Sequence, residues 1–576
     1  MPVWKLDDII RPADRESLKE ELKADVAEFK KYRRRLDAKP TAYEFVGMLK
    51  KHEELSMKAG RLEAYAGLRL AENTADQERC AHEAVISQLC ADLDNDTMFL
   101  DLWFKGLADD EAEGYIKASG GYRHMLERIR VFRPHILGES EERIINLKDL
   151  TGVEASVKLY DIITGKYRFA FEGMSLSYDE ISHYKLSPLR AQRKDAYDAT
   201  LNRFAADEEV IGEIYRSVVN DLANETVKMR NYRSPLSAAN LGNDIPDGAV
   251  DALLSVVRDE RGVFQEYFRL KAKLCGEGGM DRYDLYVPYP ALEREYPFED
   301  CKRMTLETFR GFDESMHAMA KMVFDGGHIH SELTANKQPG AFCHTVVHGT
   351  TPYVMLNHVG SLEDLYTMVH EIGHCVHSLA AKGHTEFTYR PALPLAETAS
   401  IFAEMLLTKK LIGESADGET APLLARSLDR QYATITRQAY FTLFEIEAHG
   451  RMAAGATVGE IDALYLENLR EQFAGSMAVP EIFRHEWKSI QHIYYSPFYC
   501  YSYAFGNLLV LALYRLYEKE GGAFIPKYLK VLSYGGSESP QTILEEIGLD
   551  MTKSGFWKNG FDAIREEIRL LKGITG

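Results

Sequence analysis

Apolar residues recur every three or four positions from about Arg15 to Asn146, and Glu, Lys and Arg fill most of the positions between them. This spacing is typical of amphipathic α-helices, because one face of a helix returns with every turn. Prolines fall at breaks in the pattern, for example at Pro40 and Pro134. The N-terminal part of the chain is therefore predicted to be almost entirely helical.

The pattern changes between residues 147 and 187. β-Branched and aromatic residues surround Gly165 and Gly173 in the stretch "ASVKLYDIITGKYRFAFEGMSLSYDEISHY". Such residues around glycines predict a small β-hairpin.

Helical periodicity returns after Ser187–Pro188, a pair typical of a helix N-cap followed by its first residue. A chain of 576 residues is also too long for one compact core, which predicts two or more domains or one large elongated body. We therefore expect a domain boundary here, with an N-terminal helical domain over residues 1–187 and a second domain over residues 188–576.

A second change of pattern spans residues 281–360. "DLYVPYP", residues 284–290, reads as a strand or an extended segment, and "GAFCHTVVHGTTPYVMLNHVG", residues 340–360, reads as two short strands joined at Gly349–Pro352. Almost everything after this segment has helical spacing. The fold class is therefore predicted to be mostly α, with a small β-sheet.

Composition and charge argue against several classes of function, namely nucleic-acid binding, membrane binding and secretion. The chain carries a net charge of −19, which argues against a broad surface for nucleic acid or acidic lipid. No apolar run approaches the length of a transmembrane helix, and the N-terminus turns acidic where a signal peptide would need an apolar core. Seven scattered cysteines without a CxxC pair are typical of a reducing compartment. We expect a cytoplasmic protein that binds neither nucleic acid nor membranes.

The motif "HEIGH", residues 370–374, lies within the next predicted helix. Ser361 is a good N-cap for that helix, Asp364 completes an S-x-x-D box, and Gly383 is a natural C-terminal stop. His370 and His374 are one turn apart and project from the same face, as two ligands of one tetrahedral zinc ion would. Glu371 would then lie next to the water that shares the metal site.

A third metal ligand is available on the following predicted helix. Pro391 and Pro394 precede "AETASIFAE", in which Glu397 falls in the first turns of the helix and Glu404 follows seven residues later on the same face. Glu397 would complete a His2Glu site that leaves the fourth position to water. Glu404 either accepts a hydrogen bond from a ligand histidine or is a solvated surface residue.

Three segments together resemble the thimet oligopeptidase/oligoendopeptidase F family of zinc metallopeptidases, and most closely its oligoendopeptidase F branch. They are "HEIGHCVHS", "AETASIFAE" and "HIYYSPFYCYSYAFGN". The resemblance implies one zinc ion on His370, His374 and Glu397, with Glu371 as the general base. It also implies an elongated, multi-helical, zincin-like fold in which a small sheet lies next to the HExxH helix and helices wall a deep substrate channel.

The resemblance further implies transition-state-stabilising side chains in the segment 491–503. Tyr494 and Tyr501, seven residues apart, match the spacing best, and His492 is the matching histidine; Tyr495, Tyr499 or Tyr503 could exchange roles with the two tyrosines. The strand that begins at Gly340 would pair with the substrate backbone. The substrate-binding residues implied are Gly340, Ala341, Phe342 and Tyr499.

We therefore expect a zinc endopeptidase that hydrolyses internal bonds of short, unstructured peptides as a monomer or a small homo-oligomer. One alternative is a zinc carboxypeptidase or dipeptidyl carboxypeptidase, which needs a cation for the substrate's C-terminal carboxylate. Arg484 and Lys488 are the candidates for that cation. A second alternative is an inactive helical scaffold that retains a degenerate metal site.

Overall fold

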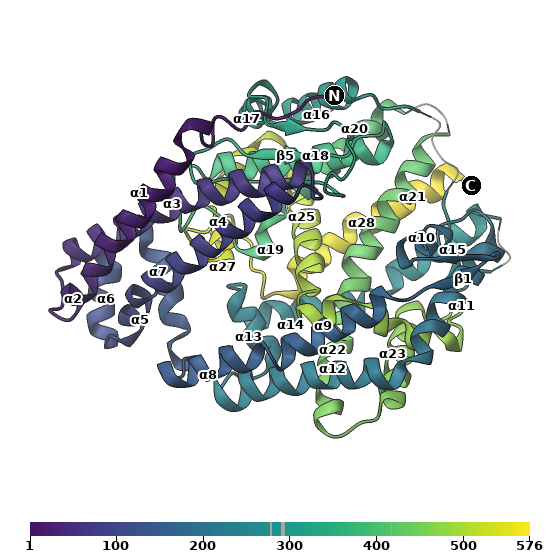
Figure 1. Cartoon of the computed structure of the whole chain (residues 1–576). Helices are drawn as coiled ribbons and strands as arrows, with labels where there is room; N and C mark the ends of the chain where they lie inside the picture. Colours follow the sequence, from purple (N-terminus) through teal and green to yellow (C-terminus); the bar gives the residue numbers. More distant parts are fainter. Residues whose placement is uncertain (277–278, 290–293, 416–417, 576) are drawn as a thin grey trace. The chain divides into compact units, whose positions relative to one another are not determined.

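The computed structural model describes residues 1–276, 279–289, 294–415 and 418–575. The chain divides into two compact units, each assembled from three separate segments. Unit 1 comprises residues 1–133, 293–410 and 516–549, and unit 2 comprises residues 134–292, 411–515 and 550–576. The mostly α fold class is confirmed (Figure 1). Within the described ranges, every helix is too short or too polar to cross a membrane.

Unit 1 is helical apart from one small sheet. Its helices are α1 (Arg15–Phe29), α2 (Arg33–Leu36), α3 (Ala42–Glu72), α4 (Gln77–Thr97), α5 (Phe99–Gly106), α6 (Asp109–Ala118), α7 (Arg123–Val131), α16 (Phe298–Phe312), α17 (Glu314–Asp325), α18 (Leu362–Ala380), α19 (Leu393–Ala396), most of α20 (Thr398–Glu414), α26 (Ile525–Ser533) and α27 (Pro540–Glu545). Its strands are β3 (Ile329–His330), β4 (Phe342–His344) and β5 (Tyr353–Met355).

The three strands of unit 1 lie in the order β3-β5-β4. β3 runs parallel to β5, and β4 runs antiparallel to it with Cys343 opposite Val354. The two short strands expected within residues 340–360 are therefore confirmed as β4 and β5. β4 lies at an edge of the sheet, so one side of its backbone carries no β-partner among the described residues.

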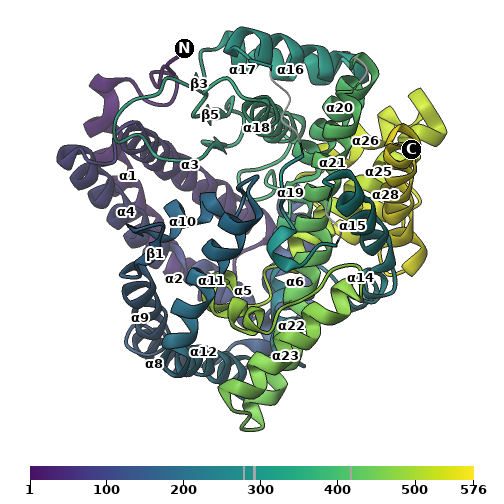
Figure 2. The same cartoon turned by 90° about the vertical axis from the view of Figure 1, so that its right-hand side faces the viewer.

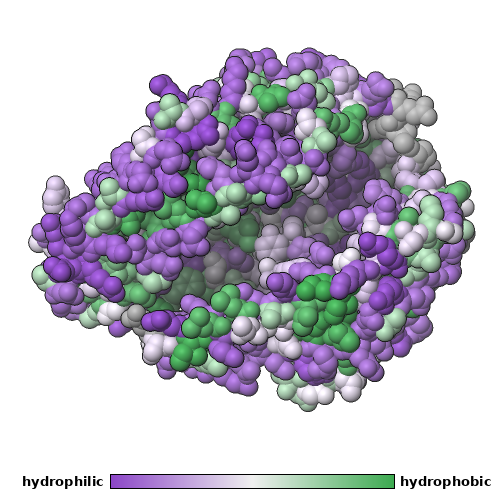
Figure 3. All heavy atoms as spheres, in the orientation of Figure 1, coloured by the Kyte–Doolittle hydropathy of each residue, from purple (hydrophilic) through white to green (hydrophobic). Residues whose placement is uncertain are grey.

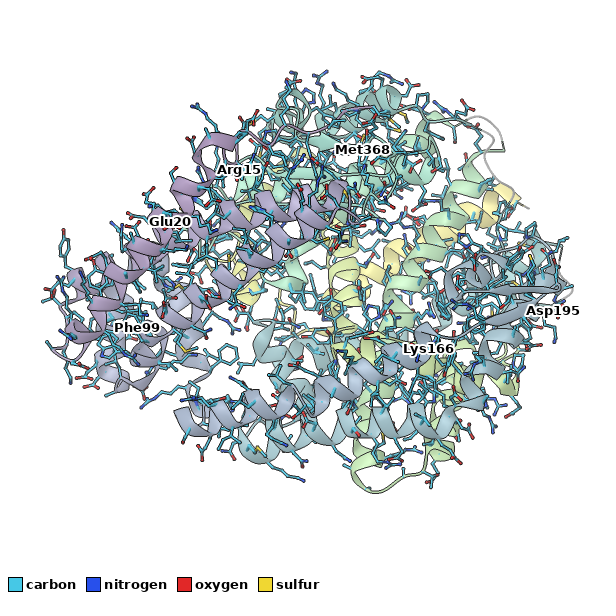
Figure 4. All side chains as sticks on the ribbon, viewed as in Figure 1. Arg15, Glu20, Phe99, Lys166, Asp195 and Met368 are labelled. Atoms are coloured by element: carbon cyan, nitrogen blue, oxygen red, sulfur yellow. The ribbon has the colours of Figure 1, made fainter. Side chains whose placement is uncertain are left out.

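The small sheet and the N-terminal helices share one hydrophobic core. This core extends from Trp4 through α1, α3, α4, α5, α6 and α7 to Val346, Tyr353 and Met355. On the sheet's other side, α18 packs against β4, β5, α16, α17 and α26 (Figure 2). The buried side of α18 includes Met368, which is 0% exposed (Figure 4). The N-terminal helices are thus part of the body that holds "HEIGH", rather than a domain of their own.

Unit 2 contains the remaining helices and a hairpin. Its helices are α8 (Glu139–Asp149), α9 (Val153–Gly165), α10 (Tyr178–Tyr184), α11 (Arg190–Ala206), α12 (Glu208–Ala223), α13 (Pro235–Gly242), α14 (Asp247–Asp259), α15 (Gly262–Leu274), α21 (Thr420–Gln431), α22 (Arg437–Ala453), α23 (Val458–Phe473), α24 (His492–Tyr495), most of α25 (Tyr501–Glu520) and α28 (Ser554–Thr575). The hairpin pairs β1 (Phe169–Phe171) with β2 (Met174–Leu176).

The small hairpin expected around Gly165 and Gly173 is confirmed: it turns at Glu172–Gly173, both with positive φ, while Gly165 ends α9. Two other expectations differ from the structure. The helix expected after Ser187–Pro188 begins two residues later, at Arg190. Residues 284–289 of "DLYVPYP" form no strand: a 3-10 helix ends at Asp284 and a turn follows, and Pro290 lies outside the described residues.

The domain boundary expected at residue 187 lies inside unit 2. The change of pattern that suggested it is the local β1–β2 hairpin, which packs with α10 and α11 in a small core of its own. The surface facing the viewer in Figure 3 is mostly hydrophilic, with hydrophobic side chains in separate patches, as the charged composition leads one to expect.

Candidate metal centre

The helix that carries "HEIGH" begins as the sequence predicts. The Ser361 Oγ accepts a hydrogen bond from the Asp364 N–H at 3.2 Å, and the Asp364 carboxylate accepts one from the Ser361 N–H at 2.7 Å. This capping box satisfies donors that the first turn leaves free. The helix ends at Ala380, and its C-cap is Ala381, so Gly383 is not the stop that we expected.

Three potential ligand atoms converge on one point of unit 1. The Nε2 atoms of His370 and His374 are 3.2 Å apart, and the Glu397 Oε2 lies 3.3 Å from the first and 3.5 Å from the second. Tetrahedral zinc, with bonds of about 2.0–2.1 Å, requires donor atoms about 3.3–3.4 Å apart. The donor set and its spacing therefore fit a zinc ion.

Carboxylates surround His370 and favour positive charge there. Its Nδ1 lies 2.7 Å from the Glu404 Oε1, on the side of the ring away from Glu397. Burial opposes charging, but the hydrogen bonds with Glu397 and Glu404 raise the pKa of His370 to about 10. Burial likewise acts against ionisation of Glu397, yet the bond with His370 lowers its pKa to about 2. Such a field suits a bound cation.

Glu397 lies at the junction of two helices, not in the first turns of one. It is the C-cap of the short helix α19, and α20 begins at the next residue. The Ser400 Oγ donates a hydrogen bond to the Glu397 Oε2 at 2.8 Å and so fixes the carboxylate. Ser400 was not singled out from the sequence, although a serine three residues after a glutamate is a pattern that allows this bond.

Gly373, the fourth residue of "HEIGH", lets α18 and α20 approach closely. A Cβ at this position would lie 2.5 Å from the Ser400 Cα and 2.9 Å from the Ala399 carbonyl oxygen. Real Cβ atoms essentially never come so close to backbone. The glycine therefore allows the backbone contact that places Glu397 beside the two histidines.

Glu371 projects into the same region but is not one of the three converging ligands. It is 8% exposed, and burial raises its pKa to about 7, while the charge on His370 and the Cys343 N–H act in the opposite direction. A carboxylate with a pKa near neutrality is suited to exchange protons at physiological pH. Its chemistry thus differs from that of Glu397, whose pKa is low.

A cavity of about 490 Å³ opens beside these residues. It is lined by Ala341, Phe342, Cys343, Thr345, His370, Glu371, His374, His377, Ser378, Tyr389, Arg390, Pro391, Ala396 and Glu397. Gly340 lines an adjoining hollow of about 310 Å³ together with Ala341. Edge strand β4 and the three potential metal ligands therefore line the same cavity. Tyr389 and Arg390 are lining residues that the sequence did not reveal, since no motif marks them.

The segment predicted to stabilise a transition state lies in unit 2. His492 is exposed there, its ring lies 6.0 Å from that of Tyr499, and its Nε2 lies 3.4 Å from the Tyr503 hydroxyl. Tyr494 is instead 1% exposed and stacks on Tyr160 at 4.1 Å.

Tyr501 is also buried, and its hydroxyl accepts a hydrogen bond from Asn243 at 2.8 Å. Tyr494 and Tyr501, which match the spacing of the family motif best, are therefore both packed inside unit 2, and their contact with substrate stays a prediction. Here α24 ends at Tyr495 and α25 begins at Tyr501, with Phe498 at φ 63° between them.

The two cations considered for a carboxypeptidase are both engaged within unit 2. Lys488 is 0% exposed, and its Nζ contacts Asp462 and lies 3.0 Å from the His485 Nδ1. Arg484 pairs with Glu481. The cluster of Glu208, Asp462 and His485, which could hold a metal ion by distance alone, thus already surrounds the ammonium of Lys488.

The chain matches models of two known protein families. Residues 183–563 match the model of peptidase family M3, and residues 103–169 match that of oligopeptidase F. An oligoendopeptidase F homolog of Lactococcus lactis subsp. lactis (strain IL1403) is 27% identical over 474 residues, covering 80% of this chain and 78% of that protein. Oligopeptidase PepF of Bacillus subtilis (strain 168) is 25% identical over 568 residues, covering 95% and 83%.

Solved structures share the fold. A crystal structure from Chlamydophila abortus has a TM-score of 0.88 and 24% identity, covering 99% of this chain and 98% of that one. Oligoendopeptidase-F from Enterococcus faecium has a TM-score of 0.71 and 22% identity, covering 97% and 98%. At these identities the likeness concerns the fold alone.

Proposed function

Because the chain belongs to peptidase family M3, we propose that it is a zinc-dependent oligoendopeptidase that hydrolyses internal bonds of short, unstructured peptides. Family membership confirms the resemblance noted in the three sequence motifs and makes the chain a peptidase. The zinc ion, the general base and the class of peptide are our proposal.

The observation that carries the proposal is the triangle of donor atoms on His370, His374 and Glu397, with sides of 3.2, 3.3 and 3.5 Å. These three residues would hold the zinc ion. When bound, zinc polarises the scissile carbonyl and lowers the pKa of water toward neutrality. Three protein ligands leave a position for water or substrate, as catalytic rather than structural zinc sites do.

Glu371 would act as the general base and acid. Its burial and its pKa of about 7 allow the carboxylate to take a proton from the attacking water and to deliver it to the departing amine. Glu404 would keep the hydrogen of His370 on Nδ1, which leaves Nε2 free to act as a ligand.

Edge strand β4 would bind the peptide backbone. Ala341 and Phe342 line the cavity beside Glu371, and Gly340 lines the adjoining hollow. Main-chain hydrogen bonds to a strand edge are indifferent to side chains, so they suit an enzyme that accepts many short peptides. A segment in regular secondary structure cannot offer its backbone in this way, which favours unstructured substrates.

The oxyanion of the tetrahedral intermediate needs a hydrogen-bond donor. We propose His492 with Tyr499 or Tyr503 for this role, because all three side chains are at least partly exposed and cluster together in unit 2. Replacing the donor is expected to reduce kcat by about 100-fold or more.

The test is cleavage of an internally quenched peptide of about ten residues whose C-terminus is amidated. We expect cleavage at an internal bond, abolished by a chelator and restored by added zinc. Cleavage only of the free-acid peptide, with release of one or two C-terminal residues, would favour the carboxypeptidase alternative. A metal-loaded protein that cleaves neither peptide would favour the inactive scaffold.

A further inference from the structure

Arg390 is the one lysine or arginine among the described residues that line the 490 Å³ cavity. The carboxylates facing this space are those of Glu371 and Glu397. The guanidinium is not buried, since the side chain is 61% exposed. A cation at this place stands out in a chain whose net charge is −19 and whose metal centre is built from acids.

The backbone that carries Arg390 is held tightly. The Gly536 N–H donates a hydrogen bond to the Thr388 carbonyl at 3.0 Å. A Cβ at Gly535 would lie 2.3 Å from the Tyr389 carbonyl oxygen, and one at Gly536 would lie 2.2 Å from that of Arg390. The two glycines therefore allow the turn after α26 to pack directly against the backbone of this segment, and this contact fixes the position of the segment.

The side chain is also oriented by its neighbour. The Arg390 Nε donates a hydrogen bond to the Tyr389 hydroxyl at 2.8 Å. Tyr389 is 2% exposed, and its hydroxyl in turn donates to the Thr345 carbonyl at 3.1 Å. Thr345 follows β4 directly. Two hydrogen bonds through the Tyr389 hydroxyl thus connect the guanidinium to the end of β4, the strand proposed to bind the peptide.

The terminal nitrogens of Arg390 make an ion pair but no hydrogen bond among the described residues. Their nearest carboxylate, on Glu386, is 3.8 Å away, which is beyond hydrogen-bonding distance. The Glu386 Oε2 already accepts a hydrogen bond from the His348 N–H at 2.6 Å. Among the described residues, no acceptor lies within hydrogen-bonding distance of either Nη atom. An arginine whose Nε is hydrogen-bonded and whose two Nη atoms donate no hydrogen bond still presents a fork that matches a carboxylate.

We propose that Arg390 forms a carboxylate-binding subsite beside the metal centre, where it binds an acidic side chain or the C-terminal carboxylate of the peptide. This inference rests on the proposed function. It assigns the cavity one charged recognition element in addition to the backbone pairing of β4. Since the overall charge of the chain disfavours acidic peptides at long range, a local cation of this kind would decide whether they are accepted.

The experiment compares peptides that differ only in carboxylates. The parent is an amidated, internally quenched peptide without acidic residues. One series replaces each residue near the scissile bond with Glu or, as its neutral match, Gln; a separate peptide carries a free C-terminus. For each we measure kcat/KM with wild type, Arg390→Met and Arg390→Glu. Arg303→Met, on the exposed surface of α16, is the control for loss of one positive charge.

We expect wild type and Arg303→Met to prefer one carboxylate. Either the peptide with Glu at one position has a kcat/KM at least about tenfold higher than the peptide with Gln there, or the free-acid peptide exceeds the amidated parent by the same factor. This ratio should fall to about one in Arg390→Met, whatever happens to the absolute rate. Arg390→Glu should prefer Lys at that position, which a merely structural role would not produce. A preference for Glu identifies a side-chain subsite, and a preference for the free acid identifies the C-terminal carboxylate.

Two results would overturn the inference. Wild type could cleave the parent yet show no preference for any carboxylate, or Arg390→Met could retain the preference in full. Either result leaves the proposed peptidase function intact. Failure of wild type to cleave any peptide would contradict both. Peptide binding provides a check that does not depend on turnover. The affinities of the Glu and Gln peptides are measured for the Glu371→Gln protein and for the double variant that also carries Arg390→Met.

Discussion

His370 is the residue whose orientation decides whether the three donor atoms can share a metal ion. The imidazole is held between the Glu404 carboxylate at its Nδ1 and the Glu397 carboxylate at its Nε2. A neutral imidazole carries one hydrogen, and Glu404, which accepts but cannot donate when ionised, keeps that hydrogen on Nδ1. The sequence suggested this partner from a spacing of seven, but spacing alone could not separate it from a solvated glutamate.

Replacing Glu404 with Gln should weaken zinc binding about 10–100-fold, because a neutral amide favours the required imidazole tautomer less strongly than a carboxylate does. Competition with a zinc chelator measures this affinity. Glu299→Gln, on the exposed first turn of α16, is the control and should bind as wild type does. Equal affinity in all three proteins would show that Glu404 does not orient the ligand.

At the scale of secondary structure, the site depends on how closely α18 and α20 pack. The start of α18 was readable from the sequence because its capping box is local, within four residues. The contact at Gly373 was not, since it depends on where a later helix lies. Substrate contact by Tyr494 and Tyr501 stays a prediction: they were chosen on the spacing of the family motif, and spacing along the chain does not show that both side chains are buried.

Gly373→Ala should push α20 away from α18, because its Cβ overlaps backbone atoms that no rotamer change can move. We expect a loss of about 1–3 kcal/mol in the free energy of unfolding, together with weaker zinc binding. Gly383→Ala is the matched control: its Cβ would meet nothing within 4 Å. Denaturant unfolding with and without zinc measures both effects. Identical behaviour of the two variants would refute the close-packing explanation.

At the scale of the whole molecule, the chain forms two units from interleaved segments. Helical content and the sheet beside "HEIGH" were predictable, because periodicity and turn residues are local properties. The division into units was not, because it depends on contacts between distant segments, such as those that join Trp4 to Tyr353 in one core. A boundary drawn where the local pattern changes therefore fell inside a unit.

Unit 2 contains a buried carboxyl group, Glu445, that links its stability to pH. Glu445 is 0% exposed; burial raises its pKa to about 8, although the Phe498 N–H, donating at 2.8 Å, acts in the opposite direction. The folded protein therefore keeps this proton up to about pH 8, whereas the unfolded chain releases it near its ordinary pKa of 4.5. The stability that the protonated Glu445 contributes at low pH is therefore lost progressively as the pH rises from 4.5 to about 8.

Glu445→Gln, which cannot ionise, should remove this loss. The variant's thermal midpoint relative to wild type should rise between about pH 5 and pH 8. Glu447→Gln, exposed on the same helix, should follow wild type at every pH. Thermal unfolding at several pH values measures the difference. A difference between Glu445→Gln and wild type that does not change with pH would contradict the assignment.

Glu371 is proposed as the proton-transferring base of a zinc peptidase. The most direct test compares wild type with Glu371→Gln, each first shown to bind one zinc ion, on an internally quenched peptide whose products are identified by mass spectrometry. We predict internal cleavage by wild type and a loss of at least about 100-fold in the zinc-loaded variant. Equal cleavage by the two zinc-loaded proteins would contradict the claim.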